Sequence, residues 1–143
     1  MKVRNAAAED AEAVARLVGE LGYPSTPEEA AARLAAIAKI ATCVAIVAES
    51  ESGLVGLATV HDLTVLHASG RVAQISLLVV AFGSRRSGVG SALVSAAETW
   101  ARWRGCKRMV VASGEGRRDA HAFYERLGFV HTSRYYSKPL GES

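Results

Sequence analysis

The stretch RRSGVGSALV, residues 85–94, places two arginines and two glycines directly before a segment with helical periodicity. Gly88 and Gly90 fall in or just before the first helical turn, where each glycine costs the helix up to about 1 kcal/mol relative to alanine. Glycine lets a ligand approach the backbone, and a helix N-terminus offers unpaired N–H groups and the positive end of the helix dipole. The pattern therefore indicates a turn whose N–H groups, from Ser87 to Ser91, surround a diphosphate.

A tight strand-to-helix turn is the alternative interpretation of the same residues. In that case the glycines serve packing and Arg85 and Arg86 face solvent, whereas an anion site would use both arginines as charge at its rim. Two nucleotide-binding motifs are excluded. A P-loop requires Gly-Lys followed by Ser or Thr, which is absent, and a dinucleotide fingerprint requires a third glycine where Leu93 stands.

Apolar periodicity on both sides of this turn predicts the element order β-α-α-β-β-β-α-β-α-β, which is an α/β or α+β class. Threonine, proline and glutamate in Thr26–Glu29 form a capping box for the second helix. The three strands that follow are expected to form an antiparallel meander. The expected helices cover 10–21, a segment from 27, 89–104 and a segment around 120–127, and the expected strands cover 2–6, 43–49, 54–66, 71–82, 107–112 and 132–138.

Length and composition bound the class of protein. The chain has 143 residues, half of them apolar, with no repeat and no linker, so we expect one domain over residues 1–143. Without an apolar run long enough to span a membrane, and without a signal-like N-terminus, a cytoplasmic protein that does not bind membranes is expected. The net charge of +3 suits anionic small molecules and nucleic acids alike.

Cysteine and histidine spacing gives no sign of a metal or redox site. Cys43 and Cys106 match no paired motif and are predicted to be buried free thiols. The four histidines lack ligand spacing, so we expect no metal. These histidines are His61, His67, His121 and His131.

Two motifs together resemble the GNAT superfamily of acetyl-coenzyme A-dependent N-acetyltransferases. They are R-x-x-G-x-G at Arg85–Gly90 and A-x-x-F-Y-E-x-x-G-F at Ala120–Phe129, and the resemblance extends over nearly the whole chain. It implies a mixed, mostly antiparallel sheet of roughly six to seven strands flanked by about four helices. It also implies acetyl-coenzyme A as co-substrate and an acyltransferase that moves acetyl to a primary amine by direct attack in a ternary complex.

The resemblance also implies roles for individual residues. In relatives, the loop after the central strand holds the coenzyme A pyrophosphate with its backbone amides. The strand before it bulges, splays from its neighbour and pairs with the pantetheine arm, and one of its N–H groups stabilises the oxyanion. The loop residues are Arg85, Arg86, Ser87, Gly88, Val89, Gly90 and Ser91, and the strand residues are Leu78, Val79 and Val80.

Tyr124 corresponds to the residue that gives a proton to the departing thiolate in relatives. A phenol of pKa about 10 and a thiol near 8.5 are close enough for transfer within a hydrogen bond. From the residues alone, a tyrosine beside Phe123 would equally well be a packing residue. The resemblance therefore carries the catalytic assignment.

The residue that deprotonates the acceptor amine is less evident. Gln74 stands where some relatives have a glutamate, and glutamine cannot act as a base. We therefore expect either a water relay or a base from elsewhere, such as Glu20, Glu115 or His61. Arg117 stands where relatives often carry asparagine, and it is expected to meet the 3′-phosphate or to face water.

The acceptor itself is not specified by these motifs. In the family it is set by the loop between the first two helices, here Leu21–Pro27 with Tyr23, and by the outer strands. A small amine, an antibiotic, a polyamine and a peptide amine all stay open. A homodimer through the C-terminal strand, with Tyr135 and Tyr136, is a family-level expectation.

Two other functions are compatible with parts of this sequence. A non-catalytic regulatory module that binds acyl-coenzyme A would keep the glycine turn but need no proton donor. A nucleic-acid binder would use the basic residues, although no recognised binding motif accompanies them, and we expect no nucleic-acid partner. These basic residues are Arg85, Arg86, Arg102, Arg104, Lys107 and Arg108.

Overall fold

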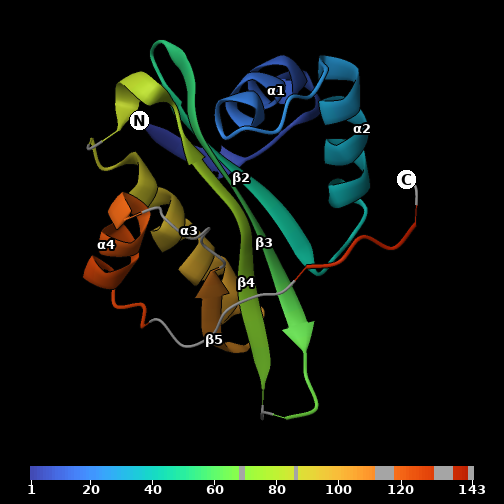
Figure 1. Cartoon of the computed structure of the whole chain (residues 1–143), viewed down its shortest axis with the longest axis vertical. Coiled ribbons are helices and arrows are strands. Elements are labelled where there is room, and N and C mark those ends of the chain that lie inside the picture. Colours follow the sequence, from blue (N-terminus) through green and yellow to red (C-terminus); the bar gives the residue numbers. More distant parts are fainter. Residues whose placement is uncertain (68–69, 86, 112–117, 131–136, 142–143) are drawn as a thin grey trace. The chain divides into compact units, whose positions relative to one another are not determined.

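The computed structural model describes residues 1–67, 70–85, 87–111, 118–130 and 137–141, and the chain forms two compact units, Met1–Val111 and Ala112–Ser143 (Figure 1). The first unit is a sheet with helices, and the second contains one helix. In chain order the elements are β1 (Lys2–Asn5), α1 (Ala11–Glu20), α2 (Pro27–Ala38), β2 (Cys43–Ser50), β3 (Gly53–Thr64), β4 (Arg71–Val80), α3 (Val89–Trp103), β5 (Cys106–Val111) and α4 (Arg118–Arg126), with short 3₁₀ turns η1 (Ala8–Asp10) and η2 (Phe82–Ser84).

The sheet of the first unit has the strand order β1-β2-β3-β4-β5. Neighbouring strands are antiparallel except for β4 and β5, which are parallel. The mixed, mostly antiparallel sheet and the antiparallel meander are confirmed. The expected six to seven strands are not, because the described residues form a sheet of five. The last expected strand, 132–138, lies mostly outside the described residues.

Helices cover both faces of this sheet: α1 and α2 pack on one face and α3 on the other (Figure 1). Because β2 is covered from both sides, Cys43–Ala48 are all buried, which explains their continuous apolar run. On the α1 side, Leu17 and Leu57 are almost fully buried. On the other side, Leu93 of α3 is equally buried.

Gly56 of β3 lets α3 approach the sheet closely at the start of the helix. A Cβ atom at this position would lie 2.7 Å from Val89 Cγ1 and 2.8 Å from Leu93 Cδ1, which is closer than carbon atoms pack. The first turn of α3 can pack this close to β3 only because residue 56 is a glycine and has no side chain.

Local sequence signals act as predicted at α2. The Thr26 hydroxyl accepts a hydrogen bond from the Glu29 N–H at 3.1 Å, and Glu29 Oε1 accepts one from the Thr26 N–H at 2.9 Å. Pro27 occupies the first helical position. The capping box is thus confirmed, and it fixes the point at which α2 begins.

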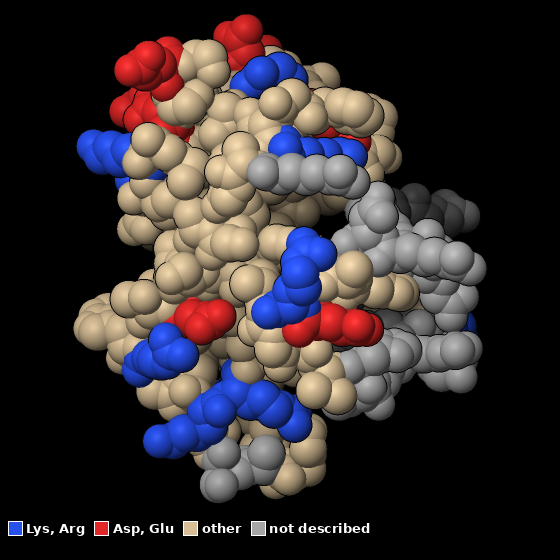
Figure 2. Space-filling view, turned by 90° about the vertical axis from the view of Figure 1, so that its left-hand side faces the viewer, with Lys and Arg blue, Asp and Glu red and all other residues tan. Residues whose placement is uncertain are grey.

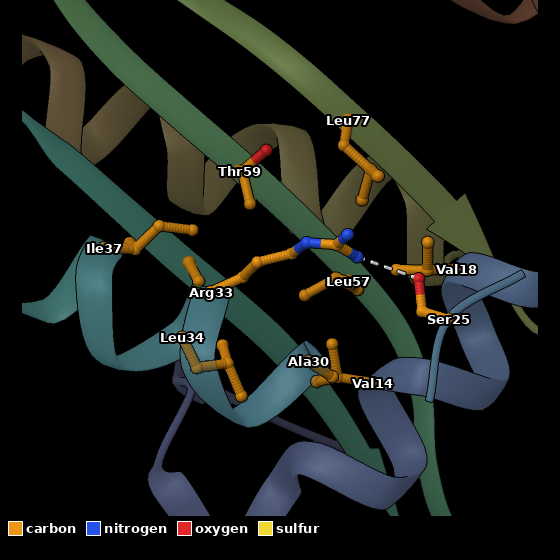
Figure 3. A pocket seen from close by; sticks show the side chains of 11 residues that line it. Val14, Val18, Ser25, Ala30, Arg33, Leu34, Ile37, Leu57, Thr59 and Leu77 are labelled. Atoms are coloured by element: carbon orange, nitrogen blue, oxygen red, sulfur yellow. Dashed lines mark hydrogen bonds between the residues drawn. The ribbon is translucent and has the colours of Figure 1, made fainter. Parts of the chain in front are cut away.

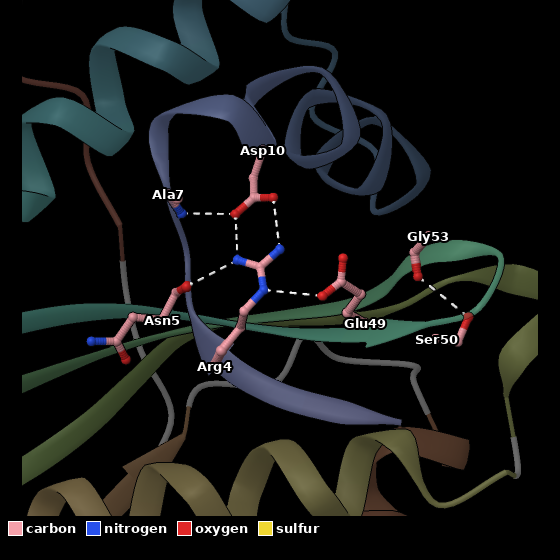
Figure 4. A network of polar contacts seen from close by, with 7 residues as sticks. All are labelled: Arg4, Asn5, Ala7, Asp10, Glu49, Ser50 and Gly53. Carbon is pink, nitrogen blue, oxygen red and sulfur yellow. Dashed lines mark hydrogen bonds and ion pairs between the residues drawn. The ribbon is translucent and has the colours of Figure 1, made fainter.

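An ion-pair network ties β1 to η1 and β2 (Figure 4). The Arg4 guanidinium donates to Asp10 Oδ2 at 2.8 Å and Oδ1 at 3.0 Å, and to Glu49 Oε1 at 3.2 Å. Asp10 Oδ2 also accepts from the Ala7 N–H at 2.7 Å. The hydrogen bonds from Arg4, together with the one from Ala7, hold the pKa of the buried Asp10 carboxyl below its usual value.

Candidate active site

The N-terminus of α3 presents backbone donors, as the sequence predicted. Gly88 precedes the helix in the left-handed conformation, with φ at +86°. Among the described residues from Gly88 onward, the first backbone N–H that donates to a preceding carbonyl is that of Ala92, which donates to the Gly88 carbonyl at 3.0 Å. Among the described residues, no acceptor faces the N–H groups of Val89, Gly90 and Ser91. This end of α3 can accept an anion.

The conformation of Gly88 explains one of the two glycines in the turn. A Cβ atom there would meet no neighbour within 4 Å, so the requirement for glycine comes from the positive φ and not from crowding. Packing, the role of the glycines in the tight-turn interpretation, is therefore not what requires glycine at residue 88. A left-handed residue before the helix is compatible with an anion site, because the N–H groups that follow it have no acceptor among the described residues.

Phe82, Arg85 and Ser87 at this turn are exposed, whereas Val89 is buried. The Arg85 guanidinium stacks over the Phe82 ring, 4.5 Å from its centre, and Ser87 Oγ donates to the Ser84 carbonyl. Glu20, a candidate base, lies at the end of α1, where its Oε1 accepts from the Phe82 N–H at 2.9 Å. Glu20 thus joins α1 to the turn.

The strand before this turn has one unpaired side in the first unit. Leu78, Val79 and Val80 pair with β3. On the opposite side the pairing with β5 ends at Ile75, which is paired with Val111, so beyond it β4 has no strand partner within residues 71–111. Val79 is buried, and Leu78 and Val80 are partly exposed. An extended ligand can therefore hydrogen-bond to this edge.

The bulge expected at residues 78–80 lies instead at Ser76. Thr59 pairs with Leu77 and Val60 with Ile75, which leaves Ser76 as the extra residue of β4. In a regular strand successive side chains point to opposite faces, so Ser76 would point away from the face that carries Leu77. The bulge lets Ser76 and Leu77 lie on the same face. The expectation about its position was therefore wrong by two residues.

The bulge assembles a polar cluster that sequence reasoning missed. Ser76 Oγ lies 2.6 Å from Thr59 Oγ1 and 2.7 Å from His61 Nε2. Cys43 Sγ lies 3.9 Å from the same His61 nitrogen, and Gln74 is opposite His61 in the strand register. We call His61, Ser76 and Thr59 the hydroxyl–imidazole cluster. His61 was one of several candidate bases, but nothing in the sequence connected it to Ser76.

A cavity of about 250 Å³ lies beside this cluster, between the sheet and helices α1 and α2 (Figure 3). Thr59 belongs to both the cluster and the cavity wall. The Arg33 side chain runs along the cavity, and its Nη1 donates to Ser25 Oγ at 3.0 Å. The cavity is lined by Val14, Val18, Ser25, Ala30, Arg33, Leu34, Ile37, Ala45, Leu57, Thr59 and Leu77.

Tyr124 lies on α4 in the second unit and is partly buried. Its ring packs edge-on against Phe123, with centres 5.3 Å apart, and against Phe129 at 5.7 Å. Gly128, just after the helix, has the left-handed conformation with φ at +94°, and the Phe129 N–H donates to the Tyr124 carbonyl at 3.0 Å. The chain after α4 thus folds back onto Tyr124.

Several candidate residues lie outside the described part of the chain. This group includes Arg86 of the glycine turn and the residues considered as base, phosphate contact or dimer contact. They are Arg86, Glu115, Arg117, His131, Tyr135 and Tyr136.

Figure 2 shows one face of the molecule on which both basic and acidic side chains are present. Arg104 Nε lies 2.5 Å from the buried Asp62 carboxylate, whose other cationic partner is Arg71 at 3.8 Å. Arg102 lies 3.3 Å from Glu98. Two of the basic residues named as a candidate nucleic-acid surface therefore take part in intramolecular ion pairs.

The cysteines are free thiols, as predicted. Cys43 is buried and Cys106 is half-buried, and burial raises the pKa of both thiols. Within the described ranges, no group of three or more His, Cys, Asp or Glu side chains has a metal-binding arrangement. None of the helices described is long and apolar enough to cross a membrane.

Comparison with known proteins places these features in a family. Residues 10–129 match the model of the acetyltransferase (GNAT) family. Over 87 residues the chain is 33% identical to the aminoalkylphosphonate N-acetyltransferase of Salmonella typhimurium, a match that covers 61% of this chain and 56% of that protein. The chain spans about half the length of the curated relatives it matches.

Solved structures share this fold over nearly the full chain. A putative acetyltransferase from Agrobacterium tumefaciens is 25% identical, with a TM-score of 0.87, and the match covers 98% of this chain and 100% of that one. A transcriptional regulator from Bacillus halodurans, 24% identical, has a TM-score of 0.88 over 97% of this chain and 99% of its own. The second likeness bears on the fold alone.

Proposed function

Because the chain belongs to the acetyltransferase (GNAT) family, we propose that it transfers an acetyl group from acetyl-coenzyme A to a primary amine. The amine nitrogen attacks the thioester carbonyl directly in a ternary complex. The new bond is C–N, the bond that breaks is C–S, and the products are an N-acetyl amine and coenzyme A. No covalent enzyme intermediate is needed, and both units, residues 1–143, act as one catalytic domain.

The observation that carries this proposal is the set of N–H groups at the start of α3. Those of Val89, Gly90 and Ser91 have no acceptor among the described residues. In the proposal they bind the pyrophosphate of the cofactor, with the backbone of Arg85–Gly88 completing the turn. The helix dipole and the Arg85 guanidinium favour the negative charge of that ligand.

The free side of β4 would bind the rest of the cofactor. Its pantetheine amides would hydrogen-bond to the strand edge at Leu78–Val80, where no strand partner is present within the first unit. A backbone N–H near Val79 or Val80 then stabilises the oxyanion that forms as the amine attacks. The apolar side chains of this stretch suffice because backbone groups do the binding.

Two proton transfers complete the reaction. An alkylamine of pKa near 10.4 is mostly protonated at pH 7, so it must lose a proton before it can attack. We propose that this proton passes through the Ser76 hydroxyl to His61, whose Nε2 lies 2.7 Å from Ser76 Oγ. The departing thiolate takes a proton from the Tyr124 hydroxyl, the role that the family motif indicates.

Thiol release from acetyl-coenzyme A tests the proposal. The wild type and Tyr124→Phe would be assayed with a panel of primary amines that includes an aminoalkylphosphonate, the class for which the Salmonella relative is named. We expect amine-dependent thiol release by the wild type and a large loss of kcat, with cofactor binding retained, in the variant. Cofactor binding without turnover of any amine would instead favour a regulatory module that binds acyl-coenzyme A.

A further inference from the structure

The cavity beside α2 narrows the class of acceptor, and this inference rests on the proposed function. We propose that the acceptor is a small monoamine with an apolar body and an anionic group, and that Arg33 binds the anionic group. A polyamine or another polycationic amine is a poor fit to this site. The argument uses the composition of the cavity wall, its one charge and the place of the hydroxyl–imidazole cluster.

The wall of the cavity is almost entirely apolar. Helix α2 contributes Leu34 and Ile37, helix α1 contributes Val18, and the sheet contributes Leu57 and Leu77. A volume of about 250 Å³ is at the small end for ligand sites and equals the space of roughly eight water molecules. The body of the acceptor is therefore short and hydrocarbon-rich.

Charge distinguishes between classes of amine. Arg33 is the charged residue in the cavity wall, and none of the lining residues is acidic. A second ammonium group in the acceptor would meet the Arg33 guanidinium and no acidic lining residue, since Glu29, which ion-pairs with Arg33, is not part of the lining. An anionic group at the same place would form charge-assisted hydrogen bonds with the guanidinium.

Arg33 has donors left for such a ligand. One Nη1–H donates to Ser25 Oγ, and Nη2 lies 3.7 Å from Glu29 Oε2, which is too long for a hydrogen bond. Glu29 uses its other oxygen in the capping box of α2. Because the Arg33 side chain is 63% exposed, water and salt screen its charge and the effect on binding is modest.

Two parts of the cavity wall are polar, Thr59 of β3 and the hydrogen-bonded pair Ser25 and Arg33. Thr59 lines the cavity and lies 2.6 Å from Ser76 Oγ, so the hydroxyl–imidazole cluster is reached from it. The amine belongs beside Thr59, next to β4. The anionic group then lies toward Ser25 and Arg33, with the apolar body between them.

Three amines with the same six-carbon chain test this arrangement. They are 1-aminohexane, 6-aminohexanoate and 1,6-diaminohexane, which differ only in the group at the far end. For the wild type we expect kcat/KM to be highest for 6-aminohexanoate, about three- to tenfold above 1-aminohexane, and lowest for 1,6-diaminohexane. Preference for the diamine would overturn the inference while leaving acetyl transfer intact.

Charge variants on α2 give the matched comparison. Arg33→Gln should remove the advantage of the carboxylate, and Glu29→Gln, which keeps an acceptor for the capping box, should increase it. Lys39→Gln makes the same charge change as Arg33→Gln at an exposed position outside the cavity and should leave the ratio unchanged. An unchanged ratio in Arg33→Gln, with normal turnover, would contradict the role of Arg33.

Binding measured without turnover separates this inference from the proposed function. Methyl signals of Leu34, Ile37 and Leu77 should shift when 6-aminohexanoate is added to the protein with coenzyme A, and higher concentrations should be needed in Arg33→Gln. If these shifts occur but no amine is acetylated, the proposed acetyl transfer is contradicted and the proposed binding site for the anionic amine is supported. If the shifts are absent or do not depend on Arg33, the inference fails.

Discussion

The Ser76 hydroxyl and the His61 imidazole lie 2.7 Å apart across two strands because β4 bulges at Ser76. The bulge turns Ser76 toward the face that also carries Thr59 and the cavity under α1 and α2. A polar pair is thereby placed beside an apolar pocket, next to the strand edge proposed to hold the thioester. This relationship makes His61 the better candidate base than Glu20, whose carboxylate accepts from the Phe82 N–H.

Removal of the imidazole should change the pH dependence of turnover. For His61→Gln we expect kcat/KM to fall by about 10²-fold, since general bases contribute roughly 10²–10⁴ to rates. The rates of the wild type and the variant should depend differently on pH, because the variant lacks the proposed base. Ser76→Ala should behave in the same way if the hydroxyl passes the proton.

Two variants serve as controls for this prediction. His67→Gln makes the same substitution in the exposed turn after β3 and should leave the pH profile unchanged. Gln74→Glu introduces, opposite His61, the residue type that some relatives carry at the position of Gln74. If Gln74→Glu leaves the profile unchanged, that position is off the proton path. A wild-type profile in His61→Gln would exclude His61 as base.

The left-handed conformation of Gly88 predicts a backbone cost for alanine. Because φ is +86° and a Cβ atom would touch nothing, Gly88→Ala should lower the free energy of unfolding by roughly 1 kcal/mol through backbone strain alone. Gly83→Ala, at an equally open position without a positive φ, should change it by less than about 0.5 kcal/mol. Urea denaturation of both variants provides the comparison.

At Gly56, in contrast to Gly88, the close approach of neighbouring side chains determines the effect of a substitution by alanine. The added methyl group of Gly56→Ala would lie 2.7 Å from Val89 Cγ1, so α3 must shift or repack, at a cost of roughly 1–3 kcal/mol. Adding Val89→Ala should recover part of this loss in denaturant unfolding. Losses that simply add in the double variant would show that the two side chains do not meet.

Asp10 should make stability depend on acid pH. Its pKa is held below the usual 3.8 by Arg4 in the folded protein, so the stabilisation is present above about pH 4 and is lost as pH falls through the folded pKa. Asp10→Asn should therefore be less stable than the wild type at pH 7, with the difference shrinking in acid. Unfolding midpoints from pH 7 to pH 2 measure this, and a constant difference would contradict it.

Structural features that depend on residues close together in the chain could be predicted from the sequence. The capping box at Thr26–Glu29 follows from residues within one turn of each other. The order of the elements from β1 to α4 was predicted from equally local patterns.

Contacts set by strand register could not be predicted. Ser76 meets His61, 15 residues away, only because one extra residue interrupts the pairing of β3 and β4. Arg4 meets Glu49, 45 residues away, only because β1 pairs with β2. Neither pair leaves a periodic signal in the chain. For this reason the glycine turn before α3 could be predicted, whereas the polar cluster and the place of Arg33 in the cavity wall could not.

The most direct test of the account follows the backbone amides of the α3 N-terminus as acetyl-coenzyme A is added. We expect the NMR signals of Val89, Gly90 and Ser91 to show the largest shifts, saturating with the cofactor, because these N–H groups would gain phosphate acceptors. Signals that stay in place while the protein binds the cofactor, or no binding at all, would contradict the claim that this turn holds the pyrophosphate.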